Sequence, residues 1–197
     1  MYAWRHMSEA DRREVIEARV QRSLPWHGPP HPGNDVRLYH VTAACYGHAN
    51  VLTGPSRLTE FEDELLSALK QNDTAEVRAW VILPDHYHIL LKTELPQLRP
   101  VLHRLHNRTS TRWNGEDGER GRKVWHAFAD RFIRGDIHYY RTINYIHANP
   151  VKHGHVDDSN EWVWSSLEGH LQRFGREELS RWWTDYPIDG YGAGWDD

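Results

Sequence analysis

Three segments of the chain show the residue pattern of β-strands, and a fourth shows it more weakly. Residues 36–46, 76–83 and 86–92 are rich in β-branched and aromatic side chains, which are typical of strands. Only a short turn that contains proline separates the second segment from the third, so these two predict a hairpin. The weaker signal lies within residues 124–132. We therefore expect a small sheet whose fourth strand lies there.

Segments whose hydrophobic residues have helical spacing lie between and beside these strands in the sequence. This spacing predicts four helices, at residues 8–22, 57–71, about 96–115 and 136–150. Thr59 and Glu62 match a capping box, in which two side chains bond to the first backbone groups of a helix. The second helix is therefore predicted to begin near Thr59. Pro150 lacks a backbone N–H group and is predicted to end the fourth helix.

The order of these elements predicts the fold class. From residue 36 onward, strand, helix, strand, strand, helix, strand and helix follow one another. This order resembles a ferredoxin-like αβ sandwich, an α+β fold in which helices pack on one face of a central antiparallel sheet. Prolines and glycines at 24–34 indicate a linker. We predict an N-terminal helix and linker over 1–34, a main domain over 35–156 and a Trp-rich C-terminal tail over 157–197.

The composition is that of a soluble globular protein. Hydrophobic residues make up 39% of the 197 positions and charged residues 26%. No apolar run approaches the roughly 18 residues that a membrane span requires, and charged residues stand at the N-terminus, where a signal peptide needs an apolar core. The single cysteine, Cys45, excludes a disulfide framework and a cysteine-based zinc site. We expect a cytoplasmic protein with no membrane partner.

Charge is distributed unevenly along the chain. The formal net charge is −4, but residues 99–152 contain eleven Lys or Arg against five Asp or Glu. Such asymmetry is typical of one basic face on an acidic body, and a basic face attracts nucleic acid. Chance clustering on a solvated surface is the alternative, and the charge alone does not exclude it.

Two histidines stand two residues apart on the second strand of the predicted hairpin. Side chains alternate along a strand, so His86 and His88 share one face while Tyr87, Ile89 and Leu91 take the other. The Cα atoms of the two histidines then lie roughly 6.6–6.8 Å apart, which allows both imidazoles to bind one metal ion. For an isolated pair of this kind, two ordinary polar residues on a solvated face are the more frequent explanation.

A tyrosine and an asparagine share one face of the last predicted helix. Tyr145 and Asn149 are four residues apart, which is about 6 Å along the helix axis, so a phenol stands beside a hard oxygen ligand. Tyr139 and Tyr140 lie on the same helix but at other phases, and Tyr140 faces the side opposite to Asn149. A tyrosine that packs in the core is the alternative explanation for Tyr145.

Three motifs of the chain occur together in one known family. They read ILPDHYHILLK, INYIHANPVKHGHV and WVWSS, and they resemble the motifs of the single-tyrosine HUH transposases, more narrowly of the REP-associated tyrosine transposases. That family has a His-hydrophobic-His strand and a helix with Tyr-x-x-x-Asn or Tyr-x-x-x-Gln. The resemblance covers residues 36–166. It implies that His86, His88 and Asn149 bind a divalent ion, Mg²⁺ or Mn²⁺, and that Tyr145 is the nucleophile.

The resemblance also implies a reaction and a substrate. Tyr145 would cleave single-stranded or hairpin DNA from repeat elements, form a 5′-phosphotyrosine intermediate and allow strand transfer. Asp85 departs from the family, which more often has asparagine at that position, and it adds a charge beside the metal ligands. The resemblance does not explain the tryptophans beyond residue 169. The oligomeric state, monomer or homodimer, stays open.

Cationic residues that follow the His-containing strand are candidates for DNA binding. They are Arg99, Arg104, Arg108, Arg112, Arg122 and Lys123. These side chains would follow the DNA backbone, while Trp113 and Trp125 would stack on bases. For each arginine taken singly, a solvated surface is the alternative.

Two other functions are compatible with parts of this pattern. A ferredoxin-like domain can bind nucleic acid without catalysis, but such a protein needs neither the histidine pair nor Tyr145. A metal-dependent phosphodiesterase can use water as its nucleophile, and it would leave no covalent adduct between protein and DNA. The combination of both histidines with Tyr145 and Asn149 favours the transposase.

Overall fold

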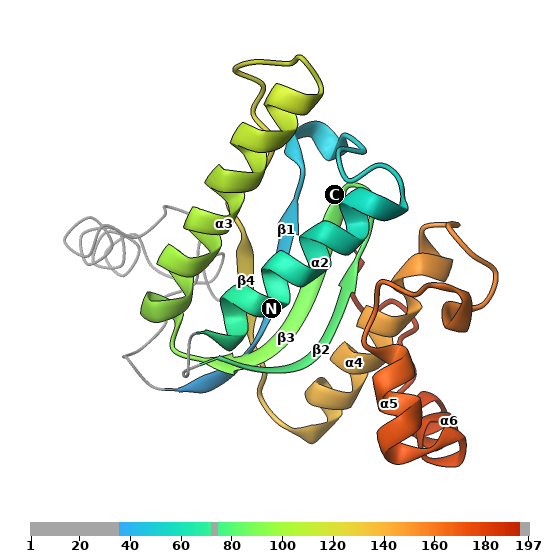
Figure 1. Cartoon of the computed structure of the whole chain (residues 1–197). Helices are drawn as coiled ribbons and strands as arrows, with labels where there is room; N and C mark the ends of the chain where they lie inside the picture. The colour runs from blue at the N-terminus through green and yellow to red at the C-terminus, as the bar shows by residue number, and fades with distance from the viewer. Residues whose placement is uncertain (1–35, 72–74, 194–197) are drawn as a thin grey trace, which may run out of the picture. The chain divides into compact units, whose positions relative to one another are not determined.

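The computed structural model describes residues 36–71 and 75–193 (Figure 1). The chain divides into two compact units, Met1–Asn34 and Asp35–Asp197, and the second contains all of the described residues. The helix predicted at 8–22 and the linker that follows it lie outside the described residues. Every strand and helix labelled in Figure 1 belongs to the second unit.

Four antiparallel strands form the central sheet. They are β1 (Arg37–Ala44), β2 (Glu76–Ile82), β3 (His86–Thr93) and β4 (Ala129–Phe132), and they lie side by side in the order β2-β3-β1-β4. Strands β2 and β3 form the predicted hairpin, with Ile82 opposite Tyr87 next to the turn. This strand order, with a helix after β1 and another after β3, is that of a ferredoxin-like sandwich. The predicted fold class is therefore confirmed.

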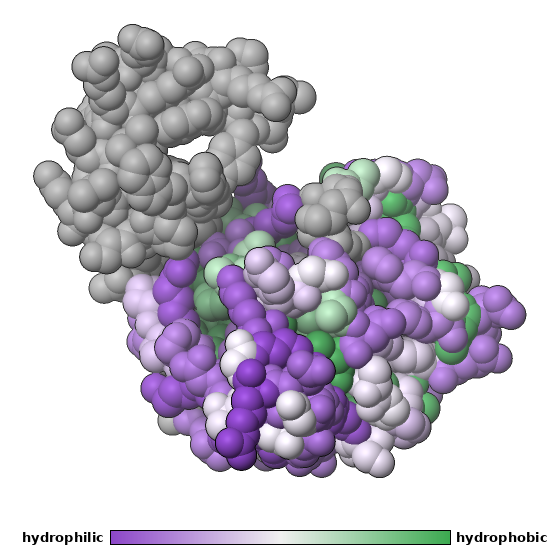
Figure 2. Space-filling view, turned by 90° about the horizontal axis from the view of Figure 1, so that it is seen from above, coloured by the Kyte–Doolittle hydropathy of each residue, from purple (hydrophilic) through white to green (hydrophobic). Residues whose placement is uncertain are grey.

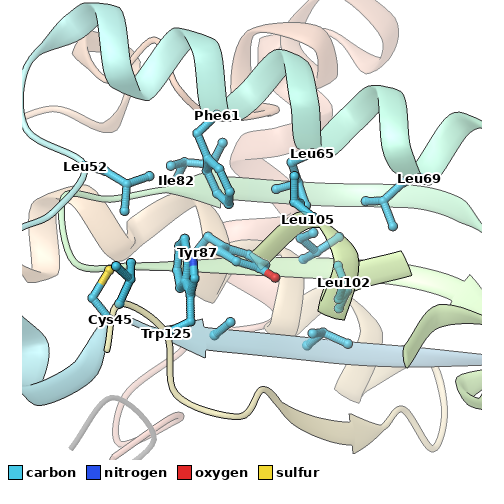
Figure 3. Close-up of a cluster of buried hydrophobic side chains, with 14 of the residues drawn as sticks. Cys45, Leu52, Phe61, Leu65, Leu69, Ile82, Tyr87, Leu102, Leu105 and Trp125 are labelled. Carbon is cyan, nitrogen blue, oxygen red and sulfur yellow. The ribbon is translucent and has the colours of Figure 1, made fainter. Parts of the chain in front are cut away.

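Two helices cover one face of the sheet. α2 (Pro55–Lys70) and α3 (Leu95–Glu116) lie in front of the strands in Figure 1. Tyr87 and Ile89 point from β3 toward these helices, as the alternation along the strand predicts. Figure 3 shows Tyr87 among the leucines of both helices and close to Phe61. Removal of these apolar side chains from water holds the two helices on the sheet.

A third helix covers the opposite face of the sheet, so the expectation of helices on one face only is wrong. α4 (Asp136–Lys152) packs on β2 and β3. There Leu90 of β3 belongs to a second buried cluster, together with Ile143 and Ile146 of α4. Because Leu90 is two residues beyond His88 along β3, its side chain faces the same side as those of the two histidines. The helix that carries Tyr145 therefore lies over the histidine pair.

The predicted tail folds into elements that extend this second layer. The 3-10 helix η3 (Ser159–Glu161) is followed by α5 (Leu167–Phe174) and α6 (Arg176–Asp185), which lie beside α4 in Figure 1. The WVWSS segment runs along the edge of β2, where the N–H of Ser166 donates to the carbonyl of Trp80 at 3.0 Å. The tail therefore completes the cover over the sheet.

Two helix boundaries differ from the predictions. α2 begins at Pro55, one turn before Thr59, because proline is tolerated in the first turn of a helix, where its missing N–H group needs no partner. Thr59 instead accepts a hydrogen bond from the indole of Trp164 at 3.0 Å. α4 continues through Pro150 to Lys152, because a proline so close to the end of a helix removes only one hydrogen bond of its last turn.

A 3-10 helix, η2 (Tyr46–His48), follows β1. Within the described residues, no helix combines the length and the apolar character that crossing a membrane requires. The face of the molecule drawn in Figure 2 is mostly hydrophilic where it is coloured, with small groups of hydrophobic side chains between the polar ones.

The buried histidine of α3 predicts a pH dependence of stability. His106 is buried against Trp125, its Nε2 atom lies 2.9 Å from the hydroxyl of Tyr87, and burial together with the nearby His103 lowers its pKa to about 3. In the unfolded chain an imidazole takes up a proton near pH ~6.5. The unfolded state therefore binds more protons below that pH, and the stabilisation that is present above pH ~6.5 is lost as the pH falls toward the pKa of the folded state.

We expect the free energy of unfolding, measured with urea at pH 7, 6 and 5, to fall with pH, and His106→Gln to reduce that fall. Between pH 6 and 5, one such proton corresponds to a slope of up to about 1.4 kcal/mol per pH unit. His103→Gln, one turn away and exposed, is the control and should leave most of the slope in place. Equal slopes in the wild-type protein and His106→Gln would contradict the prediction.

Candidate active site

The two histidines of β3 lie together between the sheet and α4. His86 stands opposite Ala44 and His88 opposite Thr42 of β1, so both point to the α4 side of the sheet. Their rings are 5.0 Å apart between centroids, and they expose 1% and 0% of their surface. The explanation of two polar residues on a solvated face is therefore excluded by their burial.

Asp85 fixes the orientation of His86. Its Oδ1 atom lies 2.7 Å from His86 Nδ1, and its Oδ2 atom lies 3.3 Å from Nδ1 of His48. Burial alone would raise the pKa of Asp85, but the hydrogen bonds from His86 and His48 outweigh it and hold the pKa below its ordinary value. The carboxylate therefore keeps the proton of His86 on Nδ1 and leaves Nε2, a buried atom with no hydrogen bond within the described residues, as a ligand atom.

His88 is oriented in the same way from β1. Its Nδ1 atom lies 2.8 Å from Oγ1 of Thr42 and 3.2 Å from Nε2 of His40. In the tautomer that offers Nε2 to a metal, Nδ1 carries the proton and donates it to Thr42. His40 and Thr42 were not predicted as site residues. The antiparallel pairing of β1 with β3 places them there, and that pairing is not visible in a local sequence pattern.

Asn149 and Tyr145 lie on the face of α4 that meets the histidines. The Nδ2 atom of Asn149 donates to the carbonyl of Tyr145 at 2.9 Å, while its Oδ1 atom is buried without a hydrogen bond in the described part of the chain. The Tyr145 ring packs edge-on against His88 and His40, at 5.3 and 5.9 Å between centroids. The structure thus brings Tyr145 against the histidine pair, and it buries Asn149 on the same face of α4.

Lys152 is a further cation beside Tyr145, and the sequence pattern did not predict it as a site residue. Its Nζ atom donates to the hydroxyl of Tyr145 at 3.3 Å and stands 4.9 Å from the centre of that ring. The two residues are seven apart, which is two turns of α4 and therefore the same helix face. The spacing was available in the sequence, but Pro150 between them predicted that the helix had already ended.

The atoms around the histidine pair fit a divalent metal ion. His86 Nε2 and Asn149 Oδ1 are buried polar atoms that lack a hydrogen bond within the described residues, and such atoms are costly unless they bind something. Across residues 36–71 and 75–193, no three His, Cys, Asp or Glu side chains form a group that could hold a metal. The candidate site therefore needs the amide oxygen of Asn149 as its third ligand. Two imidazoles and one amide oxygen suit Mn²⁺ better than Mg²⁺.

The last described residues lie against Tyr145. Tyr191 stacks edge-on against Tyr145 at 5.8 Å, and its hydroxyl hydrogen-bonds to Thr142 of α4 at 2.6 Å. Gly192 is so close to Tyr145 that an added Cβ atom would lie 2.2 Å from a ring carbon. Only 1% of Tyr145 is exposed. A glycine at position 192 is therefore required for this close approach.

The predicted DNA-binding residues lie in α3 and in the loop that follows it. Arg99, Arg104, Arg108 and Arg112 belong to α3, on the sheet face opposite to α4, and Arg122 and Lys123 lie in the segment that follows. Four of the six make ion pairs: Arg99 with Asp130, Arg108 and Arg112 with Glu64 of α2, and Arg122 with Asp117. Lys123 stands over the ring of Tyr46. DNA binding by these residues remains a prediction.

The proposed base-stacking tryptophans are core residues instead. Trp113 and Trp125 expose 0% and 6% of their surface and pack against Phe61 in the first cluster. The prediction that they stack on bases is therefore wrong. The sequence places Trp113 in a helix and Trp125 near a loop, but it does not reveal that both side chains are buried. Tyr140 also turns away from the histidines, as its helical phase predicts, and stacks on Tyr186 at 4.7 Å.

Known proteins resemble the chain in sequence. No family model matches the chain. A relative from Haemophilus influenzae, described as a REP-associated tyrosine transposase, is 32% identical over 131 residues, which are 57% of this chain and 72% of the relative. A REP-associated tyrosine transposase of Escherichia coli is 28% identical over 111 residues, 53% of this chain and 62% of that protein.

A solved structure shares the fold. It is the structure of a REP-associated tyrosine transposase bound to a REP hairpin, which aligns with a TM-score of 0.57 and 20% identity over 74% of this chain and 86% of that one. Together, the fold and the site define a tyrosine transposase. The chain belongs to the family of REP-associated tyrosine transposases, since it covers 72% of a relative that is 32% identical to it.

The metal site predicts binding that can be measured without DNA. We expect Mn²⁺ to raise the melting temperature of the protein relative to EDTA, because a ligand that binds only the folded state stabilises it, by about 2.7 kcal/mol at 100 times its Kd. His86→Ala, His88→Ala and Asn149→Ala should each remove most of this shift. His126→Ala, an exposed histidine on Tyr46, is the control and should keep it. A shift that survives all three site variants would place the ion elsewhere.

Proposed function

We propose that the protein cleaves single-stranded or hairpin DNA through a 5′-phosphotyrosine on Tyr145 and then transfers the strand. The observation that carries this proposal is the packing of Tyr145 from α4 against the buried histidine pair of β3. Asn149 is buried on the same face of α4, four residues beyond Tyr145. Support for the substrate comes from the solved relative, which is bound to a REP hairpin. Repeat DNA that folds into hairpins is therefore the proposed target.

Tyr145 supplies the nucleophile. In the first step its hydroxyl oxygen attacks the phosphorus of the scissile linkage, and the bond from phosphorus to the 3′-oxygen breaks. The tyrosine hydroxyl gives up its proton in this step, and the leaving 3′-oxygen takes up a proton. One strand end is then a 5′-phosphotyrosine and the other a free 3′-hydroxyl. A second 3′-hydroxyl can reverse the step, because the phosphodiester energy is kept in the tyrosine ester. Strand joining therefore needs no nucleoside triphosphate.

His86, His88 and Asn149 would hold the divalent ion. When bound there, the ion would polarise the scissile phosphate and offset negative charge on it. Asp85 and Thr42 keep the two imidazoles turned with Nε2 toward that position. Lys152 places a positive charge beside the oxygen that attacks, where it also favours the approach of a phosphate.

Access to Tyr145 requires a movement of the chain. The ring is almost fully buried, with Tyr191 and Gly192 against it. A phosphate can reach the hydroxyl in line with the leaving oxygen only when these residues shift away from α4. The hydrogen bond from Tyr191 to Thr142 would break in that movement.

The covalent adduct is the direct test of the proposal. We expect incubation with a hairpin oligonucleotide and Mn²⁺, followed by proteolysis and mass spectrometry, to show a nucleotide on the peptide that contains Tyr145. Tyr145→Phe should lose the adduct. Tyr140→Phe is the matched control on the same helix and should keep it, since Tyr140 packs on α6 and Tyr186.

The same experiment separates the alternative functions. A cleaved strand without any adduct would favour the water-dependent phosphodiesterase. Hairpin binding without cleavage in Mn²⁺ would favour the binding module. An adduct that persists in Tyr145→Phe would show that another side chain is the nucleophile.

Lys152 predicts a graded effect on cleavage. A hydrogen bond to a charged group is worth about 1.5–3 kcal/mol, so Lys152→Met should slow single-turnover cleavage by roughly 10- to 100-fold. Lys152→Arg keeps the positive charge and should recover part of the rate. Lys70→Met, exposed at the end of α2, is the control for loss of a surface charge and should cleave at the wild-type rate. A wild-type rate in Lys152→Met would remove this residue from the reaction.

A further inference from the structure

A second cationic site lies on α4 beside the nucleophile. A cavity of about 380 Å³ opens at the start of the helix, and its lining includes Arg134, His138, Arg141 and Tyr191. Arg141 precedes Tyr145 by four residues, so the two share one face of α4 at about 6 Å along the axis. Tyr191 lines the cavity and also stacks on Tyr145. The cavity and the candidate active site are therefore neighbours on the same helix face.

The two arginines of this cavity differ from Arg108 and Arg112 of α3 in their partners. Within residues 36–71 and 75–193, neither Arg134 nor Arg141 makes an ion pair, whereas Arg108 and Arg112 are paired with carboxylates of α2. The Nε atom of Arg141 is buried and makes no hydrogen bond in this part of the chain. A buried guanidinium donor without an acceptor is costly, and an anion would supply the acceptor.

The charges around the cavity favour an anion. Burial lowers the pKa of His138, and the positive charges of Arg134 and Arg131 lower it further. The charge of Arg134 therefore acts on the His138 ring. The backbone N–H of Arg134 donates to His138 Nδ1 at 3.2 Å. Asp136 also lines the cavity and opposes an anion, but it is one carboxylate against two guanidinium groups.

We propose that Arg134 and Arg141 form a subsite for a DNA backbone phosphate next to the scissile one. Arginine binds phosphate through two parallel N–H donors, which fixes the direction of the strand as well as its position. A strand held at Arg141 places its neighbouring linkage one helix turn further along α4, at Tyr145. The exposed side chain of Ile137 on the rim gives a nucleotide base an apolar surface. This proposal rests on the function proposed above and names the contact that aligns its substrate.

The first experiment measures binding alone. It uses the full chain with Tyr145→Phe, so that no cleavage occurs, and a fluorescent single-stranded oligonucleotide at several salt concentrations. Arg141→Gln and Arg134→Gln should each weaken binding roughly 10- to 100-fold and lower the slope of log K against log salt by about 0.7, the value for one phosphate contact with a single strand. Lys70→Gln removes the same charge from α2, on the other sheet face, and should change neither quantity.

The second experiment replaces the phosphates one at a time. Oligonucleotides with a single neutral methylphosphonate linkage, placed at each position on either side of the cleavage site, are titrated against the Tyr145→Phe protein. One linkage adjacent to the cleavage site should cost roughly 10-fold or more in affinity. In Arg141→Gln the same replacement should cost almost nothing, because the contact is already absent. Arg141→Lys, which keeps the charge without the paired donors, should retain part of the penalty.

The outcomes distinguish this subsite from the catalytic proposal. Equal methylphosphonate penalties in the wild-type background and in Arg141→Gln, at every position, would overturn the subsite. So would Arg141→Gln and Arg134→Gln that bind as Lys70→Gln does, with the same salt slope. A protein that never forms the Tyr145 adduct but shows the coupled penalty would overturn the catalytic proposal and leave the subsite in place.

Discussion

Strand β3 is buried on both of its faces, and the arrangement of the site depends on this constraint. Every side chain from His86 to Leu91 is inaccessible to water, so the strand needs a cover on each side. Helices α2 and α3 cover the face of Tyr87 and Ile89, and α4 covers the face of the histidines. A helix placed there for packing also brings its own polar residues against His86 and His88. The geometry of the candidate site is thus a consequence of the core.

Burial of so many polar groups requires that each be oriented by a partner. Asp85 and Thr42 hold the Nδ1 atoms of the two histidines, and the carbonyl of Tyr145 holds the amide nitrogen of Asn149. These bonds turn His86 Nε2 and Asn149 Oδ1 toward positions where the described residues offer no hydrogen-bond partner. A core that satisfies one end of each side chain and leaves the other end unsatisfied is costly without a ligand. The cost is reasonable at a site that binds a metal ion.

The second layer is held to the sheet by the motif that ends in two serines. Ser166 donates its backbone N–H to Trp80 of the edge strand, and its hydroxyl lies 2.9 Å from Nε2 of the buried His147. His147 belongs to α4, two residues beyond Tyr145, and burial holds its pKa well below the ordinary value. The neutral ring can therefore share a hydrogen bond with Ser166. This connection explains how the WVWSS segment helps to position α4, the helix that carries Tyr145.

The sequence predicted those features that depend on neighbours along the chain. The hairpin, the opposite faces of β3 and the shared phase of Tyr145 and Asn149 all follow from local periodicity, and the structure has each of them. It did not predict contacts that depend on tertiary pairing. His40 enters the site only because β1 pairs with β3. Lys152 was missed because Pro150 predicts a helix end by a local rule, whereas a proline so close to the end removes only one hydrogen bond of the last turn.

The placement of the arginines shows that ion pairs between residues far apart in sequence were also not predicted. The positive excess of residues 99–152 counts only charges that are close in sequence. Glu64 of α2 lies outside that window and pairs with Arg108 and Arg112, so part of the excess is neutralised within the fold. A guanidinium group that is paired with a carboxylate attracts a phosphate more weakly, since the carboxylate offsets its charge. The attraction that remains is therefore decided by which arginines make no ion pair with a carboxylate, and in the described part of the chain Arg134 and Arg141, on the helix that carries Tyr145 or directly before it, are two of these.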